Sequence, residues 1–415
     1  MTMHKFTLTL VSLLVVGFLH AQLPSILMMC QDTSWRSKNM MAIASGEAGI
    51  GSNALDVAFM QKALLGGRLE PEHIERLSGR MPSRSRAGYV ASAQLELLNF
   101  RDTLFSNPRL GLRACLSTNY QGYLGFQPNA FRTVFQGNSG QAGSAGALGP
   151  LAMQNQAWQK FGFGLFNKST LSGFTLSLVE GQSYQSLVID QLSLFTAAAA
   201  DSLSLSTTGE FFRSDTLRSG WANGSGIGAC IDLDYNLPLR KGKSLLSLTV
   251  RNLGFVTWNS ESEHYSLDGS TAWNGVNVTD WLSGSDAEVM MPSWSDSLNS
   301  ARTQSSSLKS LPTTVSFRYI THWRKKHYWE TGWSLAPNRA WVPQAYVGMA
   351  HALNDRLWVS ERISYGGYAG LAVGAEVQWL SKNAWFVRAG ATQLEGWFLS
   401  QAGGRNVYFN LGKNF

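Results

Sequence analysis

Charged side chains are scarce in this 415-residue chain: they make up 15% of the sequence, against about 25% in an ordinary soluble domain. Aromatic residues reach 12%, with 15 tryptophans, and there are 41 glycines. Length does not decide between two or three soluble domains and one large barrel, because all-β barrels exceed the usual domain length. The composition favours a membrane barrel, in which one strand face meets lipid and Trp and Tyr lie at the two interfaces.

Long apolar runs are missing beyond the first twenty residues, so no later segment can cross a bilayer as a helix. Any membrane span therefore has to be built from strands. Cysteine is also rare: Cys30, Cys115 and Cys230 are an odd set without metal-ligand spacing. The net charge of +7 comes from basic residues scattered into turns, which predicts weak attraction to anionic surfaces at most and no nucleic-acid partner.

The beginning of the chain has the pattern of a secretory signal peptide. Lys5 precedes an apolar run over residues 6–18, and Ala21 offers a cleavage point. A membrane anchor is the alternative, but the run is shorter than the roughly 20 apolar residues of a spanning helix. We therefore expect a signal peptide at 1–21, export, and a mature protein over 22–415 that lies in a bacterial outer membrane.

The C-terminal half alternates apolar and polar residues in segments of about ten, the length of a tilted membrane strand. Ile227 and Leu233 share one face of the segment 227–235, and Asp232 and Asp234 share the other. Further strands are expected at 246–251, 312–323, 328–336, 341–352, 357–366, 370–380, 384–394 and 405–415. A soluble sandwich would alternate in the same way. The short links at 324–327, 353–356 and 381–383, all on one side, favour a barrel with tight periplasmic turns.

The N-terminal half adds expected strands at 39–49, 87–100, 109–119, 158–166 and 172–180. The sequence thus predicts an all-β, antiparallel up-and-down transmembrane barrel of about fourteen strands. Residues 183–212 are interpreted as an external hairpin, and counting them in the wall would give sixteen. Short helical extracellular inserts are expected near 51–85 and 120–136, and a long Trp-rich extracellular loop at 257–311.

Four stretches resemble a known family: MMAIASGEAGIGSNAL, the FQGN of residues 135–138, GIGACIDLDYNLPL and LLSLTVRNLGFVTW. The last two carry the closest resemblance. The family is an uncharacterised group of Bacteroidota outer-membrane proteins, itself similar to the FadL-like long-chain fatty-acid transporter barrels. The resemblance implies fourteen strands, inserts able to plug the lumen and passage of apolar molecules. It does not imply an enzyme. Lys413 departs from the pattern of barrel assembly signals, which usually have an aromatic or apolar residue two positions before the end.

Charged residues on the expected inner face are the first candidate site. Asp232 and Asp234 would either bind a cation or act as acid and base, or simply line a solvated lumen. Arg362, Glu376 and Arg388 come from consecutive strands and predict an Arg-Glu-Arg ladder, which either binds an anionic head group or crosslinks the wall. Arg251 is expected on the same lumen face.

Catalytic chemistry has no support in the sequence. There is no G-x-S-x-G setting, no phosphate-binding glycine loop, and no His or Cys at metal-ligand spacing. We therefore predict no enzyme, no catalytic residue, no metal and no cofactor. The Trp-rich loop, with Trp258, Trp273, Trp281 and Trp294, would either bind glycans or a partner, or pack over the barrel mouth.

Two functions remain open. In the first, an apolar small molecule is captured by the helical insert through Leu55, Phe59, Leu64 and Leu65 and then moves passively through the barrel. In the second, the barrel is a non-transport anchor or accessory subunit of a secretion or surface-assembly complex. Both imply contact with outer-membrane lipid, and with the barrel-assembly machinery through the C-terminal strand that ends at Phe415.

Overall fold

The computed structural model describes residues 39–101, 103–199, 201–218, 223–240, 243–273, 302–324, 326–381 and 383–415. The predicted signal peptide and Cys30 lie outside these ranges, as do Trp281 and Trp294. Among the described residues, no helix is long and apolar enough to cross a bilayer.

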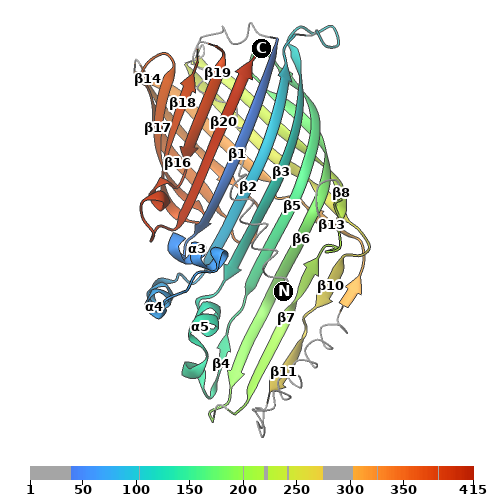
Figure 1. The fold of residues 1–415 in the computed structure, drawn as a ribbon, viewed down its shortest axis with the longest axis vertical. Coiled ribbons are helices and arrows are strands. Elements are labelled where there is room, and N and C mark those ends of the chain that lie inside the picture. Colours follow the sequence, from blue (N-terminus) through green and yellow to red (C-terminus); the bar gives the residue numbers. More distant parts are fainter. Residues whose placement is uncertain are drawn as a thin grey trace.

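Fourteen of the described strands close into an antiparallel barrel (Figure 1). Each strand pairs with the next wall strand along the chain, and the last strand pairs with the first from Met41↔Asn414 to Gly51↔Gly404. The strand count and the order predicted from the sequence are therefore confirmed. The wall consists of β1 (Met40–Ser52), β2 (Ser85–Asn99), β3 (Leu110–Phe126), β5 (Leu151–Asn167), β6 (Gly173–Thr196), β8 (Gly226–Leu239), β9 (Ser244–Trp258), β14 (Thr314–Arg324), β15 (His327–Leu335), β16 (Val342–Ala352), β17 (Leu357–Gly367), β18 (Gly370–Leu380), β19 (Trp385–Ala391) and β20 (Gly404–Asn414).

The two ends of the barrel differ in their connections. At one end the wall strands are joined by short links, among them 353–356 and 381–384, as the sequence predicts; we call this the short-turn end. The other end, the loop end, carries the helices α3 (Val57–Leu65), α4 (Pro71–Arg80) and α5 (Pro128–Gln136) and the short helices η2 (Ser139–Gln141) and η4 (Leu394–Trp397). In Figure 1 the C-terminus marks the short-turn end, and the helices lie at the opposite end.

A small sheet projects from the loop end beyond the barrel wall (Figure 1). Strand β6 pairs with β8 as far as Gly181 and then with β7 (Leu203–Arg213) from Gln185 onward. The sheet also contains β4 (Ser144–Ala147), β10 (Glu263–Ser266) and β11 (Gly269–Trp273), while β12 (Arg302–Gln304) and β13 (Ser307–Ser310) lead back to the wall. Residues 183–212 thus form the predicted hairpin and add no further strand to the wall.

Tryptophan 258 stabilises the point at which this sheet leaves the barrel. Its side chain is fully buried against Val179, Tyr184 and Phe212. A Cβ at Gly181 would lie 2.6 Å from the Trp258 ring, so the ring fits only because that residue is glycine. The terminal Trp of the N-L-G-F-x-x-W stretch therefore has a packing role.

Side chains alternate between the two faces of the wall, as the period of two requires. Outward-facing apolar residues are half or more exposed, which suits contact with lipid acyl chains; they include Leu95, Phe163, Leu178, Ile227, Ile363 and Leu371. Inward-facing positions are mostly polar and buried, as with Glu96, Lys160 and Asn410. The barrel therefore has an apolar outside and a polar inside.

Closure of the barrel leads to a first prediction. Ala44 pairs with Leu411 across the seam between β1 and β20. Paired antiparallel residues have Cα atoms about 4.5–5.5 Å apart, within reach of a disulfide. With the three native cysteines replaced by alanine, the double variant Ala44→Cys, Leu411→Cys should crosslink on oxidation and migrate differently on a non-reducing gel after heating.

The matched control pairs Ala44→Cys with Ile363→Cys, which lies on β17, away from the seam. This control should not crosslink within one chain. Equal crosslinking of both pairs, or of neither, would contradict the closed barrel.

Candidate functional site

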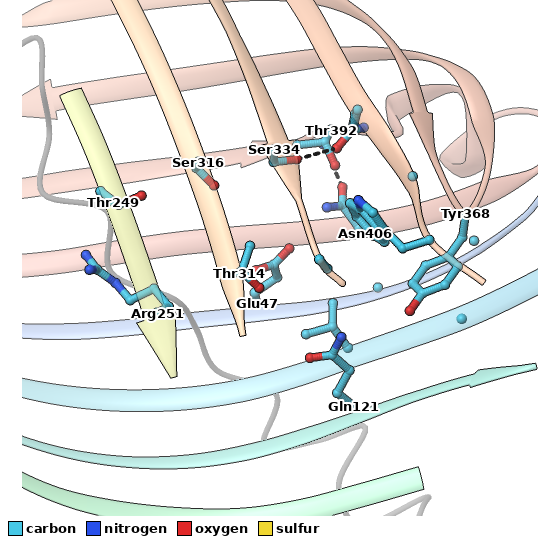
Figure 2. A pocket seen from close by; sticks show the side chains of 18 of the residues that line it. Glu47, Gln121, Thr249, Arg251, Thr314, Ser316, Ser334, Tyr368, Thr392 and Asn406 are labelled. Carbon is cyan, nitrogen blue, oxygen red and sulfur yellow. Dashed lines mark hydrogen bonds between the residues drawn. The ribbon is translucent and has the colours of Figure 1, made fainter. Parts of the chain in front are cut away.

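A cavity of about 340 Å³ occupies the part of the lumen nearer the loop end (Figure 2). Its wall is polar, with hydroxyl and amide groups contributed by strands on opposite sides of the barrel, including Gln121, Ser316, Ser334, Thr392 and Asn406. Gln121, Ser316, Ser334 and Asn406 face inward because they occupy the inner register of β3, β14, β15 and β20, and Thr392 directly follows β19. A polar lumen is the ordinary interior of an outer-membrane barrel.

Aromatic rings also line the cavity, among them Tyr89, Trp158, Trp341 and Tyr368. Trp341 and Tyr368 stack edge to face with ring centroids 4.9 Å apart. The buried indole N–H groups of Trp158 and Trp341 have no hydrogen-bond partner among the described residues. Since buried donors are normally satisfied, these two groups are exceptions among the described residues.

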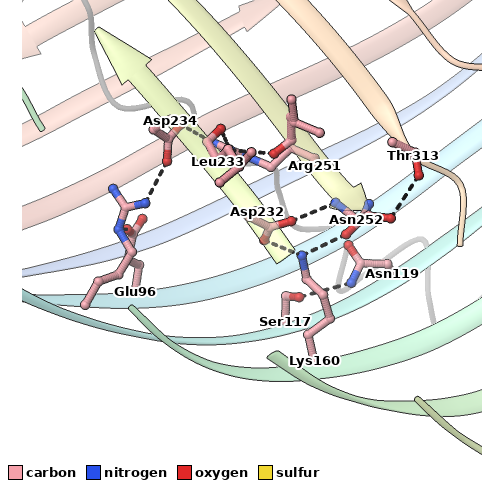
Figure 3. A network of polar contacts seen from close by, with 12 residues as sticks. Glu96, Ser117, Asn119, Lys160, Asp232, Leu233, Asp234, Arg251, Asn252 and Thr313 are labelled. Carbon is pink, nitrogen blue, oxygen red and sulfur yellow. Dashed lines mark hydrogen bonds and ion pairs between the residues drawn. The ribbon is translucent and has the colours of Figure 1, made fainter. Parts of the chain in front are cut away.

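Beside the cavity, charged side chains form the first of two crosslinks of the inner wall (Figure 3). Asp234 lies between two arginines: Arg113 Nη1 is 2.6 Å and Arg251 Nη2 is 2.5 Å from its carboxylate oxygens. Arg113 also pairs with Glu96 at 2.7 Å. These charges come from β2, β3, β8 and β9, so the network ties together strands that are not neighbours.

Asp232 belongs to the same network. Lys160 Nζ donates to the Asp232 carboxylate and to Asn252 Oδ1, both at 2.7 Å, and the Asn252 backbone N–H donates to Asp232 at 2.7 Å (Figure 3). Asn252 has φ 57°, a left-handed conformation that asparagine tolerates better than most residues. It sits at the register shift between β8 and β9. Arg251 and Asn252 thus position both aspartates.

The second crosslink contains the predicted ladder with one change. Arg388 Nη2 pairs with Glu376 at 2.7 Å, as expected. Arg362 reaches Glu376 through an intermediate: its Nη2 donates to the Tyr408 hydroxyl at 2.6 Å, and that hydroxyl donates to Glu376 at 2.5 Å. Arg318 and Glu330 form a further ion pair at 2.6 Å.

All six predicted lumen residues therefore lie on the inner wall, in two separate groups. Asp232 and Asp234 are 8% and 9% exposed and ion-paired, and Asp234 also lines the cavity. Sequence reasoning missed Arg113, Lys160 and Tyr408, although their alternation with apolar neighbours marks them as inward-facing. Two histidines, His327 and His351, meet with their Nδ1 atoms 2.8 Å apart. No group of three or more possible metal ligands lies within the described ranges.

The structure does not bring the four residues proposed for ligand capture together. Leu55 and Phe59 are buried in the core of the helical insert, where Phe59 packs 5.6 Å from the Phe131 ring. Leu64 and Leu65 are about half exposed at the end of α3. No residue of α3, α4 or α5 is among those that line the cavity. Capture of a ligand by these four residues remains a prediction.

A buried carboxylate holds the helical insert together. Asp56 caps α3 by accepting the Phe59 N–H at 2.9 Å, and its side chain is fully buried. His73 Nε2 lies 2.9 Å from the same carboxylate, and Arg76 and Arg80 approach it at 3.4 and 3.3 Å. Asp56 therefore fixes α4 against the start of α3.

The fold and the site define a class: a closed fourteen-stranded barrel of the outer-membrane type with a polar cavity inside. The chain belongs to the family of unknown function DUF5723, which matches residues 48–384. None of the curated proteins compared with the chain matches it.

Solved structures that resemble the chain are barrels. A FadL homologue from Pseudomonas aeruginosa aligns with a TM-score of 0.42 and 10% identity over 92% of each chain. The Pseudomonas putida toluene transporter TodX aligns with a TM-score of 0.37 and 10% identity, over 91% of this chain and 90% of that one. A TodX deltaS2S3 mutant, named as a monoaromatic hydrocarbon channel, has a TM-score of 0.41 and 10% identity over 96% of each chain. These TM-scores are too low to support an argument about the fold. The barrel is established by the strand pairing of this chain itself.

The first crosslink leads to a stability prediction. Replacing Asp234→Asn leaves Arg113 and Arg251 buried without their shared counter-charge, and breaking such a pair costs about 3 kcal/mol or more. The urea midpoint of the refolded protein in detergent micelles should fall accordingly. The matched control is Asp190→Asn, because Asp190 and Arg339 are exposed and 3.7 Å apart. Loss of the exposed Asp190–Arg339 ion pair should lower the stability by about 1 kcal/mol or less. Equal effects of the two variants would contradict the role of Asp234.

A further prediction concerns the helical insert. Asp56→Ala removes the cap of α3, worth about 1 kcal/mol by itself, and leaves His73 and both arginines without their partner. Trypsin should then cleave after Arg68 much faster, while the barrel keeps its mobility on an unheated gel. Glu75→Ala, an exposed change on α4, should leave cleavage at the wild-type rate. Unchanged cleavage in Asp56→Ala would show that the insert does not depend on this carboxylate.

Proposed function

We propose that this protein is a passive outer-membrane barrel whose lumen binds a small molecule on its way across the membrane. The observation that carries the proposal is the cavity. Its volume of about 340 Å³ lies at the lower end of the range of roughly 300–1,000 Å³ for small-molecule sites. Outward-facing apolar side chains around the wall support the placement in a membrane.

The ligand that fits this lining is amphipathic. The rings of Tyr89, Trp158 and Tyr368 offer apolar contact. Hydroxyl and amide groups such as those of Ser334 and Gln121 also line the cavity. A purely apolar cargo would displace water from these polar groups without offering them a hydrogen bond. The apolar molecule expected from the sequence is therefore refined to one with an apolar body and a hydrogen-bonding head.

Blocking the cavity tests the proposal. Ser316→Trp and Ser334→Trp each place a large ring in the lumen from a cavity-lining position. Permeation of small polar solutes, measured by swelling of proteoliposomes, should fall by about tenfold, which corresponds to about 1.4 kcal/mol. The same variants should release any lipid or fatty acid that copurifies with the wild type.

Thr331→Trp is the control, because Thr331 lies on β15 beside Ser334 but is exposed on the outer face. It should leave permeation unchanged. A wild-type barrel that passes no solute, or blocked variants that pass as much as the control, would contradict passage through the lumen.

The projecting sheet favours a second candidate function, that of an anchor or accessory subunit with a docking surface. Its strands are crosslinked by Glu263, which pairs with Arg213 and, at 2.6 Å, with Arg302. Burial alone would raise the pKa of Glu263, but hydrogen bonds from Arg213 and Tyr265 outweigh it and lower the pKa. Gentle detergent extraction that yields a stoichiometric protein partner and an empty lumen would favour this function over transport.

A further inference from the structure

The short-turn end of the barrel gathers basic side chains that are far apart in the sequence. Among the residues that the structure describes, seven arginines and lysines there are exposed, and they lie in or directly beside four different links around the circumference. We call them the basic rim: Arg101 and Arg109 between β2 and β3, Arg240 and Lys243 between β8 and β9, Arg324 at the end of β14 with Lys326 in the link that follows, and Arg356 between β16 and β17.

Little negative charge opposes the basic rim. Asp355 is the only acidic residue that the structure describes in these links. None of the seven rim residues forms an ion pair with another described residue. The loop end differs: residues 53–84 hold five basic and four acidic residues, and two of the arginines, Arg76 and Arg80, pair with Asp56. The basic rim is thus a local excess of charge and does not merely reflect the overall composition.

Aromatic side chains form a belt directly beside the basic rim on the outer face of the wall. Trp323, Trp329, Trp379 and Trp385 are 37–49% exposed, and all lie within two residues of the short-turn ends of their strands. Tryptophan at such positions marks the membrane interface. Cations contact these rings: Arg324 lies 4.9 Å from the Trp323 centroid, and Lys413 Nζ lies 4.9 Å from that of Trp385.

We propose that the basic rim binds the phosphate groups of anionic phospholipids in the leaflet at the short-turn end. The belt of tryptophans sets the level of the lipid interface, and the seven cations stand at the adjacent headgroup level. Because the cations are spread around the barrel, they match a ring of separate lipid headgroups better than one compact partner. The positive side chains also complement anionic lipid in charge. This inference rests on the proposed membrane placement but is independent of what the lumen carries.

Lipid selectivity tests the proposal. Wild-type protein is reconstituted into vesicles of equimolar phosphatidylcholine and phosphatidylglycerol, and the lipids retained after mild solubilisation are counted by native mass spectrometry. The protein should retain several-fold more phosphatidylglycerol than phosphatidylcholine. The preference should weaken as sodium chloride is raised, because salt screens exposed charges.

A charge-matched pair of variants locates the effect. The rim variant carries Arg109→Gln, Arg240→Gln, Arg324→Gln and Arg356→Gln, and the control carries the same change at the loop-end residues Arg68, Arg84, Arg218 and Arg339. The rim variant should retain the two lipids almost equally, whereas the control should keep the wild-type preference. Both variants should float with the vesicles and show heat-dependent gel mobility, which confirms that the barrel is inserted.

Three results would overturn the proposal: no preference in the wild type, an undiminished preference in the rim variant, or an equal loss in both variants. Failure of the wild type to insert into vesicles would instead refute the membrane placement itself. Loss of permeation in the lumen variants with intact lipid preference would separate the two proposals, because the rim and the cavity share no residue.

Discussion

The pairing of β1 with β20 is the constraint on which the rest of the structure depends. A strand at an open edge of a sheet leaves a row of backbone N–H and C=O groups unpaired. Inside a bilayer each such group costs several kcal/mol. Eleven residue pairs, from Met41↔Asn414 to Gly51↔Gly404, close that row. Once the wall is closed, every strand has an inside and an outside. The separation of polar from apolar side chains then follows from the period of two along each strand.

The closed wall also explains why charges are buried so freely in the lumen. A carboxylate such as Asp234 would be costly in an apolar core, yet here it is surrounded by cations from two other strands. The two crosslinks lie beside the cavity, and part of each contributes to its lining. Asp234, Arg251, Arg318 and Arg362 belong both to the crosslinks and to the cavity lining. The ion pairs that crosslink the barrel therefore also contribute charged side chains to the wall of its cavity.

Most of the wall could be predicted from the sequence, because strand alternation and turn length are local properties. The fourteen strands, their order and the hairpin at 183–212 follow from such signals and agree with the structure. The exchange of β6 from β8 to β7 could not be predicted in detail, since it depends on Trp258 packing against Gly181 from a strand about 80 positions away. The partners of individual side chains could not be predicted either. The alternation along the strands places Arg362 and Glu376 on the inner face, but only the curvature of the wall brings Tyr408 between them. The basic rim could not be predicted for a similar reason. Its members are isolated in the sequence and come to the same end of the barrel only when the strands align.

The distribution of charge bears on how such a barrel works. Residues Arg240, Arg324 and Arg356 stand at the end with short links. The loop end has helices and a projecting sheet that can contact molecules outside the membrane. A small molecule inside the lumen would meet aromatic rings, hydroxyl and amide groups and charged side chains of the crosslinks in one wall. Because Asp234 and Glu376 already pair with arginines beside them, these arginines would attract a free anion less strongly than unpaired cations would. Under the proposed function, such a wall favours a passive, weakly binding channel.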